Sequence, residues 1–397
     1  MGKITTVLGD ISPEELGYTT IHEHPFMRAD SDGVLPLPED ATPEKTAFAV
    51  ENLTYLKTST CSWTLKEYLG NDDLELEIKE LLEFKKTGGQ ALLDATYIGC
   101  RVNDYPNKIR ELSRRSGIKI ICGTGYYGDY TYSADFDPND SKAIRQRLIA
   151  ELTEGMEGSD LKAGYIKKGF GLSDEISAAD MSVFRSICEV AAETDNPFVI
   201  HGPNTRESAL EAVRIAVKEY GIKPERIDMC HMDFLYSTYC KYYPDAKAYF
   251  SDPTKAAASV ADFASELLDM GVYVNFDGWG DIHGSRHKLN QGFDYCWGFD
   301  DFFRLAVVAK LLEKGYAEKI MFGHDKYNKL GGFYGGAYGY TRFPTFAIPA
   351  LREMGYEKEA HRCKPGKIPQ PFLNQTATPQ NKVSTILCDR KKLGVLI

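Results

Sequence analysis

Residues 17–24 read GYTTIHEH, and this stretch decides the fold that we expect for the chain. It is a β-branched run that ends in two histidines separated by one residue. Because alternate residues of a β-strand share a face, His22 and His24 are expected to point to one side and Glu23 to the other. Imidazole is the most common metal ligand in proteins. The stretch therefore predicts a strand that carries metal ligands at its carboxyl end.

Similar short apolar runs recur along the chain, and a longer helical pattern follows each of them. Such alternation predicts a parallel sheet covered by helices. Eight runs in one chain fit a closed α/β barrel, the (β/α)8 TIM barrel, better than an open sheet. The predicted strands are Tyr18–His24, Ala91–Thr96, Ile118–Thr124, Gly164–Phe170, Phe198–His201, Arg226–His231, Val272–Phe276 and Lys319–Gly323. Predicted helices between them include Glu75–Lys86, Asp180–Glu193, Arg206–Tyr220 and Ala257–Met270.

The 397 residues are expected to form one barrel domain, 1–360, and a C-terminal tail, 361–397. The tail is rich in Pro, Lys, Gln and Asn, and we expect it to be poorly packed. Two long connections, Pro25–Gly70 and Asp277–Phe299, follow the first and seventh strands. Loops that follow strands form the active-site mouth of such a barrel, so these long loops are expected at its C-terminal face.

Composition excludes several classes of function. A net charge of −10 argues against nucleic acid as a partner, since phosphate contacts need clustered Lys and Arg. Nine dispersed cysteines without a CxxC pair predict reduced thiols rather than a disulfide framework. The N-terminus lacks a signal-peptide pattern and no apolar run reaches about 18 residues, so we expect a cytoplasmic protein that does not cross a membrane.

Polar residues of one chemical kind follow further predicted strands. In a barrel the carboxyl ends of all strands surround one mouth, so these side chains are expected to meet there. Each signal is weak alone, because a single histidine after a strand is more often a surface or core residue. Alternation places only one of two consecutive lysines inside the barrel, and the pattern alone does not choose between them. The residues are Lys167 or Lys168 on the fourth strand, His201 on the fifth, His231 on the sixth and Asp325 on the eighth.

From Gly9 to Gly355 the chain resembles the phosphotriesterase family of the amidohydrolase superfamily. The motifs that carry the resemblance are GYTTIHEH (17–24), DATYIGCR (94–101), AGYIK (163–167), VIHGPN (199–204), CHMD (230–233), GHD (323–325) and GGFYGGAYGYTRFPTFAIPALREMG (331–355). The segment after residue 355 departs from the pattern with which relatives close the barrel, which leaves the packing of the C-terminus open.

The resemblance implies a centre of two divalent ions. It implies that His22, His24 and Asp325 bind a buried ion, that His201 and His231 bind a more exposed one, and that carboxylated Lys167 bridges both. A buried lysine beside cations has a lowered pKa, so its neutral amine can react with CO2. The carbamate can join ions about 3.5–4 Å apart. Nitrogen and oxygen ligands favour Zn²⁺, with Mn²⁺, Co²⁺ or Fe²⁺ as alternatives.

These ions are expected to activate a bridging water as hydroxide, which attacks the substrate, while Asp325 shuttles the proton to the leaving oxygen. The substrate must be a small molecule chosen by the mouth of the barrel. Basic and tyrosine residues gather there, which favours an anionic substrate. The alternative is that the basic residues of the loop after the seventh strand do not bind substrate. They would then lie in solvent, with their charges paired to Asp281. The expected substrate-binding residues are Tyr97, Arg101, Lys241, Arg286 and Lys288.

We therefore expect a lactonase that opens a phosphorylated aldono-1,4-lactone or a similar polar lactone. The alternatives are a phosphotriesterase-like or N-acyl-homoserine lactone hydrolase and, from another class, a non-catalytic metal- or sugar-binding barrel. The resemblance also implies a homodimer.

Overall fold

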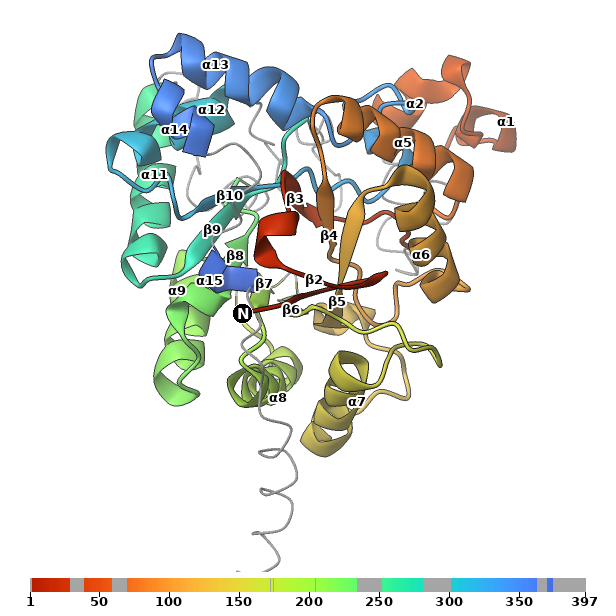
Figure 1. Cartoon of the computed structure of the whole chain (residues 1–397), viewed down its shortest axis with the longest axis vertical. Coiled ribbons are helices and arrows are strands. Elements are labelled where there is room, and N and C mark those ends of the chain that lie inside the picture. Colours follow the sequence, from red (N-terminus) through yellow and green to blue (C-terminus); the bar gives the residue numbers. More distant parts are fainter. Residues whose placement is uncertain are drawn as a thin grey trace, which may run out of the picture.

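The computed structural model describes residues 2–28, 39–58, 70–171, 173, 175–203, 205–233, 252–280, 301–362 and 370–373. Eight parallel strands form a single sheet in sequence order, and the helices surround it (Figure 1). The TIM barrel predicted from the sequence is confirmed. The barrel strands are β3 (Thr19–Glu23), β4 (Ala91–Asp94), β5 (Lys119–Tyr126), β6 (Tyr165–Gly169), β7 (Phe198–His201), β8 (Ile227–Cys230), β9 (Tyr273–Phe276) and β10 (Ile320–Phe322).

One helix follows each barrel strand and packs on the outside of the sheet. These are α5 (Leu74–Lys86), α6 (Tyr105–Ser116), α7 (Ser141–Thr153), α8 (Ala178–Thr194), α9 (Arg206–Arg214), α11 (Pro253–Asp269), α12 (Asp301–Glu313) and α13 (Ile348–Glu353). Shorter helices are α1 (Pro43–Thr46), α2 (Leu53–Thr58), α14 (Glu357–Arg362) and α15 (Gln370–Leu373). None of the helices in the described ranges is both long and apolar enough to span a membrane.

The lumen of the barrel is a packed core. Alternate residues of every strand point inward, and their side chains fill the space below the mouth. The inward-facing cluster contains Ile21, Ala91, Leu93, Ile121, Tyr165, Val199, Cys230, Tyr273 and Met321, with Ile4 and Leu16 from the N-terminal segment.

Part of the C-terminal tail belongs to this core. Phe372 and Leu373 of α15 are buried in the same cluster as the inward-facing strand residues. Arg226 donates a hydrogen bond of 3.0 Å to the Phe372 carbonyl, and the Phe372 ring meets Tyr273 edge-on. The expectation of a poorly packed tail is therefore wrong for Phe372 and Leu373, because two apolar side chains in a polar stretch suffice to dock a short helix. The rest of the tail from residue 363 lies outside the described residues.

An N-terminal hairpin was not predicted from the sequence. Strands β1 (Ile4–Thr6) and β2 (Gly9–Ile11) pair antiparallel, and Val7 N donates to Ile120 O at 2.9 Å. Strands of three residues carry too short a pattern to be recognised by alternation.

The barrel closes between β3 and the chain that leaves β10. Asp325 N donates to His22 O at 2.9 Å, and His24 N donates to Lys326 O at 3.1 Å. The pairing of β3 with β4 shifts register between Thr20 and Glu23, so Ile21 and His22 both face the lumen although they are consecutive. A Cβ at Gly323 would lie 2.9 Å from His22 N, so only glycine lets the two strands approach this closely.

We predict that Gly125→Ala destabilises the barrel by about 3 kcal/mol or more. Gly125 on β5 pairs with Lys167 on β6, has a φ of +146°, and its Cβ would lie 1.7 Å from Lys167 O. Gly158→Ala is the matched control, since its φ is +72° but nothing lies within 4 Å of the added carbon. The control should cost only about 1–2 kcal/mol of backbone strain. Urea unfolding measures both, and equal losses would mean that β5 can move away from β6.

Candidate metal centre

His22 lies at the centre of a buried cluster at the carboxyl ends of the strands. Its Nε2 is 2.8 Å from the Lys167 Nζ and 3.7 Å from Asp325 Oδ1. His24 approaches the same carboxylate, with 3.3 Å between Nε2 and Asp325 Oδ1. The side chains of β3, β6 and the β10 end therefore meet at one point, as the sequence predicted.

The other two predicted ligands lie on the adjacent side of His22. The His231 ring centroid is 4.5 Å from that of His22 and 4.2 Å from that of His201. His231 Nδ1 is 3.9 Å from Asp325 Oδ2. All six residues predicted as ligands thus form one continuous cluster.

Two of these residues have a strained backbone. His231 and Asp325 have φ angles of +60° and +47°, in the left-handed region that non-glycine residues rarely adopt. Each costs on the order of 1–3 kcal/mol and tends to occur at functional sites. Both follow the last residue of a barrel strand directly or closely, where the chain turns out of the sheet.

The structure separates the two consecutive lysines. Lys167 lies on the lumen side of β6 together with Tyr165, and its side chain is fully buried. Lys168 points outward, where its Nζ is 2.8 Å from Asp180 Oδ1 and donates to Tyr127 O at 2.9 Å. Only Lys167 is therefore placed where it can contact the histidines.

Burial sets the charge of the cluster. It lowers the pKa of both His22 and His201 well below the usual value, and nearby Lys167 adds to the effect, so both imidazoles stay neutral with a lone pair free. Burial also lowers the pKa of the Lys167 amine, against the opposing effect of Cys230 and Asp325. Burial alone would raise the pKa of Asp325, but His22 and a hydrogen bond from His24 bring it below its ordinary value, so it remains a carboxylate.

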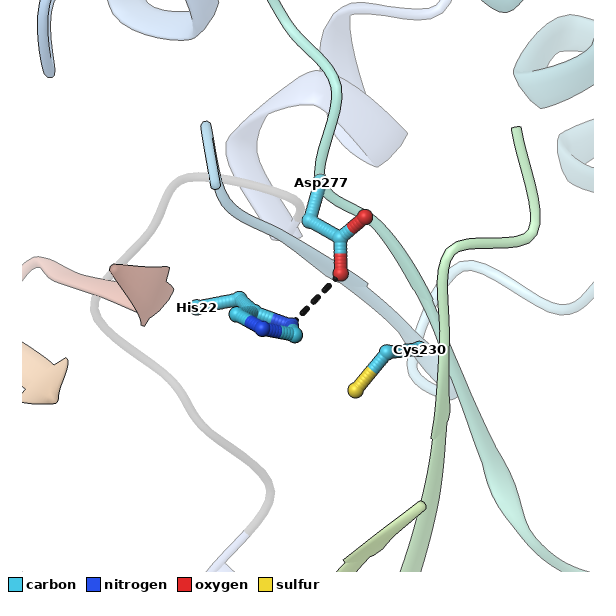
Figure 2. Close-up of side chains that lie close together, drawn as sticks. All are labelled: His22, Cys230 and Asp277. Atoms are coloured by element: carbon cyan, nitrogen blue, oxygen red, sulfur yellow. Dashed lines mark ion pairs between the residues drawn. The ribbon is translucent and has the colours of Figure 1, made fainter. Parts of the chain in front are cut away.

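Asp277 is a site residue that sequence reasoning missed. It follows β9, and its Oδ1 lies 2.7 Å from His231 Nδ1. Its Oδ2 lies 2.8 Å from His22 Nδ1, and Figure 2 shows this second contact. A carboxylate behind a histidine fixes the ring orientation and raises its basicity toward a metal. Its place at the end of a strand, like that of the predicted ligands, is a signal that could have identified it. The same position also begins the long loop 277–299, to which the sequence analysis assigns it.

The donor set fits the implied ions. Two groups of three possible ligands lie within 4.8 Å in the described part of the chain: His22, His24 and Asp325, and His22, Cys230 and Asp277. The first group is the predicted site for the buried ion. In the second group His22 Nδ1 faces Asp277 without the geometry of a hydrogen bond, although both groups are buried. We interpret that carboxylate as the support of His22 and His231 rather than as a ligand. His201 and His231 would supply two nitrogens to a second ion, whose site a carboxylated Lys167 would complete.

Tyrosines form a wall beside His201. The Tyr127 hydroxyl lies 3.0 Å from His201 Nδ1, and its ring stacks on Tyr97 with 4.7 Å between centroids. Tyr130 meets the Tyr127 ring edge-on. The predicted substrate residue Tyr97 therefore contributes to the wall through Tyr127, whereas Tyr126 packs on Phe136 away from it.

Arg101 does not lie with these residues. Its guanidinium binds Glu151 at 2.8 Å, Glu157 at 3.1 Å and the Gly123 carbonyl at 3.2 Å. The turn after Tyr97 takes the chain back behind β5, so an arginine close in sequence to the mouth becomes a buried structural cation. We therefore do not retain it as a substrate-binding residue. The predicted Lys241, Arg286 and Lys288 lie outside the described residues.

Comparison with known proteins places this arrangement in a family. A model of the phosphotriesterase family matches residues 2–240 and 256–363. The chain belongs to the phosphotriesterase family. It is therefore a metal-dependent hydrolase of ester or amide bonds, on a scaffold whose members hold two metal ions.

Individual relatives are distant but cover nearly the whole chain. A phosphotriesterase-related protein of Nematostella vectensis is 28% identical over 90% of this chain and 94% of its own length. The human N-acetyltaurine hydrolase is 26% identical over 89% of this chain and 93% of its own length. Among solved structures, a resiniferatoxin-binding protein from Rhodobacter sphaeroides has a TM-score of 0.74 at 25% identity and covers 94% of this chain and 95% of its own. A lactonase from Listeria monocytogenes shares the fold, with a TM-score of 0.68 at 20% identity, and covers 94% and 99%.

We predict that Arg101→Leu destabilises the protein by about 3–5 kcal/mol, because the buried Glu151 carboxylate loses its buried cation and keeps only the part-exposed Arg147 and a hydrogen bond from Thr124. Arg115→Leu removes the surface partner of Glu75 and serves as control, with an expected cost of at most about 1 kcal/mol. Chemical unfolding measures both. An unchanged stability of Arg101→Leu together with a raised KM would instead return Arg101 to the substrate site.

Proposed function

We propose that the protein hydrolyses a small acyl compound that carries an anionic group, by attack of water on its carbonyl carbon. The observation that carries the proposal is the convergence of six ligand side chains from five barrel strands on one point below the mouth. Two divalent ions, for which Zn²⁺ is favoured, would lower the pKa of a water molecule between them and polarise the substrate carbonyl.

The ligands divide into two sets. His22, His24 and Asp325 would hold the buried ion, and His201 and His231 the more exposed one. Lys167 would bridge them as a carbamate: its amine nitrogen forms a bond to the carbon of CO2 and releases one proton. The buried position and lowered pKa of this amine support the step, since only the neutral amine is a nucleophile.

The remaining chemistry falls to side chains of the chain itself. Asp325 is ionised, so its carboxylate can accept the proton of the attacking water and return it to the leaving group. The Tyr127 hydroxyl beside His201 is a donor on the side of the more exposed ion. Its ring, held against Tyr97, excludes water from that side of the centre.

Two substrate classes fit this chemistry. The first is the phosphorylated aldono-1,4-lactone predicted from the sequence. The second is an N-acyl aminosulfonate, which is favoured by the curated relatives named N-acetyltaurine hydrolase at 24–27% identity. Both are small, both present a carbonyl to the ions, and both carry a strong anion away from it.

A substrate panel tests the proposal. The metal-loaded protein is offered a phosphorylated lactone, its neutral counterpart, N-acetyltaurine and a neutral phosphotriester. We expect the kcat/KM of an anionic carbonyl substrate to exceed that of its neutral counterpart by roughly 10–150-fold, the worth of one hydrogen bond to a charged group. A preference for the triester or for a neutral lactone would favour a phosphotriesterase-like or acyl-homoserine lactone hydrolase. Binding without turnover of any of them would indicate a non-catalytic barrel.

We predict that Lys167→Ala loses at least one of two bound ions and nearly all activity. A short carboxylic acid that enters the vacated space is expected to restore part of both, because it supplies the missing bridging oxygens. Metal content by mass spectrometry and turnover provide the two measurements. Lys168→Met is the control, since its amine faces away from the cluster and its loss should leave two ions per folded chain. The opposite pattern would place the bridge at Lys168.

A further inference from the structure

Below the metal centre, the barrel contains polar atoms that the proposed function does not use. Asp228 on β8 is 1% exposed, and neither of its carboxylate oxygens has a hydrogen-bond partner among the described residues. Asn275 on β9 is fully buried, and within the same part of the chain its Oδ1 also has no partner. Buried acceptors without donors are rare in proteins, and each costs on the order of 1–3 kcal/mol. Three such oxygens on neighbouring strands therefore call for an explanation.

The register of the strands places both residues in the lumen. Asp228 pairs with Val199 on β7 and with Tyr273 on β9, and both of these partners belong to the inward-facing cluster. Asn275 lies two residues after Tyr273 on β9, so it faces the same side. Asp277 follows two residues later.

Asn275 and Asp277 form a chain of polar groups that leads to the proposed metal centre, and Asp228 lies on the neighbouring strand β8. Asn275 Nδ2 donates to Asp277 Oδ2 at 3.2 Å. Asp277 in turn contacts His231 Nδ1 at 2.7 Å and His22 Nδ1 at 2.8 Å. We name Asp228, Asn275 and Asp277 the lumen column. Its upper end touches two proposed ligands, and its lower end is the unpartnered carboxyl group.

If Asp228 were ionised, no cation among the described residues around it would balance its charge. The charged group that acts on Asp228 most is Asp277 of β9, which is itself an acid. The other titratable groups around it are Cys230 on its own strand, Tyr273 on β9 and Tyr165 on β6, none of which is a cation. Burial first and Asp277 second raise the pKa of Asp228 well above its usual value. A neutral acid, unlike a carboxylate, has a proton to donate.

We propose that Asp228 is a neutral carboxylic acid that anchors the lumen column and thereby orients Asp277 and, through it, His22 and His231. Asp228 and Asn275 Oδ1 make no direct hydrogen bond with each other, so the Asp228 proton would supply the donor that Asn275 Oδ1 lacks through a buried water between them. Asn275 is then held with its Nδ2 toward Asp277 rather than flipped. Asp228 and Asn275 are positioning residues, and they reach the ions only through Asp277. The orienting role rests on the proposed metal centre, whereas the protonation state of Asp228 does not.

The first experiment tests that protonation state on the full-length protein. The unfolded chain loses the Asp228 proton above about pH 4, while the folded chain keeps it. The unfolding constant of the wild type relative to Asp228→Asn should therefore rise up to tenfold per pH unit over about pH 5 to 8. Glu151→Gln is the control. Arg101 keeps the pKa of Glu151 low against the effect of burial, so Glu151 is ionised in both the folded and the unfolded chain. The unfolding constant of the wild type relative to Glu151→Gln should therefore stay flat over the same pH range.

A ratio of unfolding constants that stays flat over about pH 5 to 8 would overturn the neutral acid, because Asp228 would then be ionised in both states. A flat ratio with Asp228→Asn less stable than the wild type would in addition indicate a paired carboxylate. Difference infrared spectra give a direct check, since wild type minus Asp228→Asn should contain the carbonyl stretch of a protonated acid at neutral pH.

The second experiment tests the orienting role by chelator competition. Asn275→Leu and Asp228→Val should weaken metal binding about 10–100-fold, the usual cost of losing an outer partner of a metal ligand. Asp228→Asn, which stays neutral and keeps hydrogen-bonding capacity, should remain close to wild type. Equal affinities in all four proteins would refute the orienting role even if Asp228 is neutral. A wild type that binds no ions would refute the metal centre and the orienting role together, while the pH and infrared results would still stand.

Discussion

The hydrogen bond from Asp325 N to His22 O closes the barrel, and the centre depends on it. It brings the first and last strands together at the level of their ligands, so a carboxylate and an imidazole from opposite ends of the sequence lie 3.7 Å apart. Two local departures from regular structure make this possible. The register shift in β3 turns both Ile21 and His22 into the lumen, and Gly323 removes the Cβ that would collide with His22. The geometry of the site is thus set by the contact between β3 and the chain that leaves β10, rather than by any one strand.

Charge is arranged in layers along the barrel axis. Burial lowers the pKa of His22 and His201 and keeps both neutral, and the Asp277 carboxylate lies directly behind His22 and His231. Asp228, with no cation beside it among the described residues, lies deeper still. On the proposed ligand assignment this arrangement would be compensated, because metal ions at the mouth would attract the Asp277 charge and a neutral Asp228 would avoid repelling it. Outside the sheet, by contrast, buried cations such as Lys168 and Arg101 have their own acids, so they do not disturb the lumen.

The sequence was sufficient to predict the barrel strands, from hydrophobic periodicity, and the clustered site residues, from the polar residues at strand ends. All eight barrel strands were located, with Phe198–His201 matched to the residue, because each is a short apolar run of its own. The six clustered residues were found because barrel topology gathers strand ends whatever their sequence separation. Arg101 was predicted at the mouth, but it lies elsewhere because a turn of three residues before it reverses the chain. A periodic hydrophobic pattern gives no sign of such a turn. Asp277 was missed because its partners are far along the chain, and the hairpin β1–β2 and helix α15 were missed because three or four residues are too few to carry a pattern.

The docking of α15 also has a consequence for how the protein matures. Phe372 and Leu373, with Ile4 and Leu16, pack the lower end of the lumen with apolar side chains. On the proposed ligand assignment, CO2 and metal ions would therefore reach the buried Lys167 from the side of the mouth. On the proposed ligand assignment, ions that arrive first would stand between the gas and the amine. Carboxylation would then have to precede metal loading, and bicarbonate supplied during refolding would raise the share of the protein that becomes active.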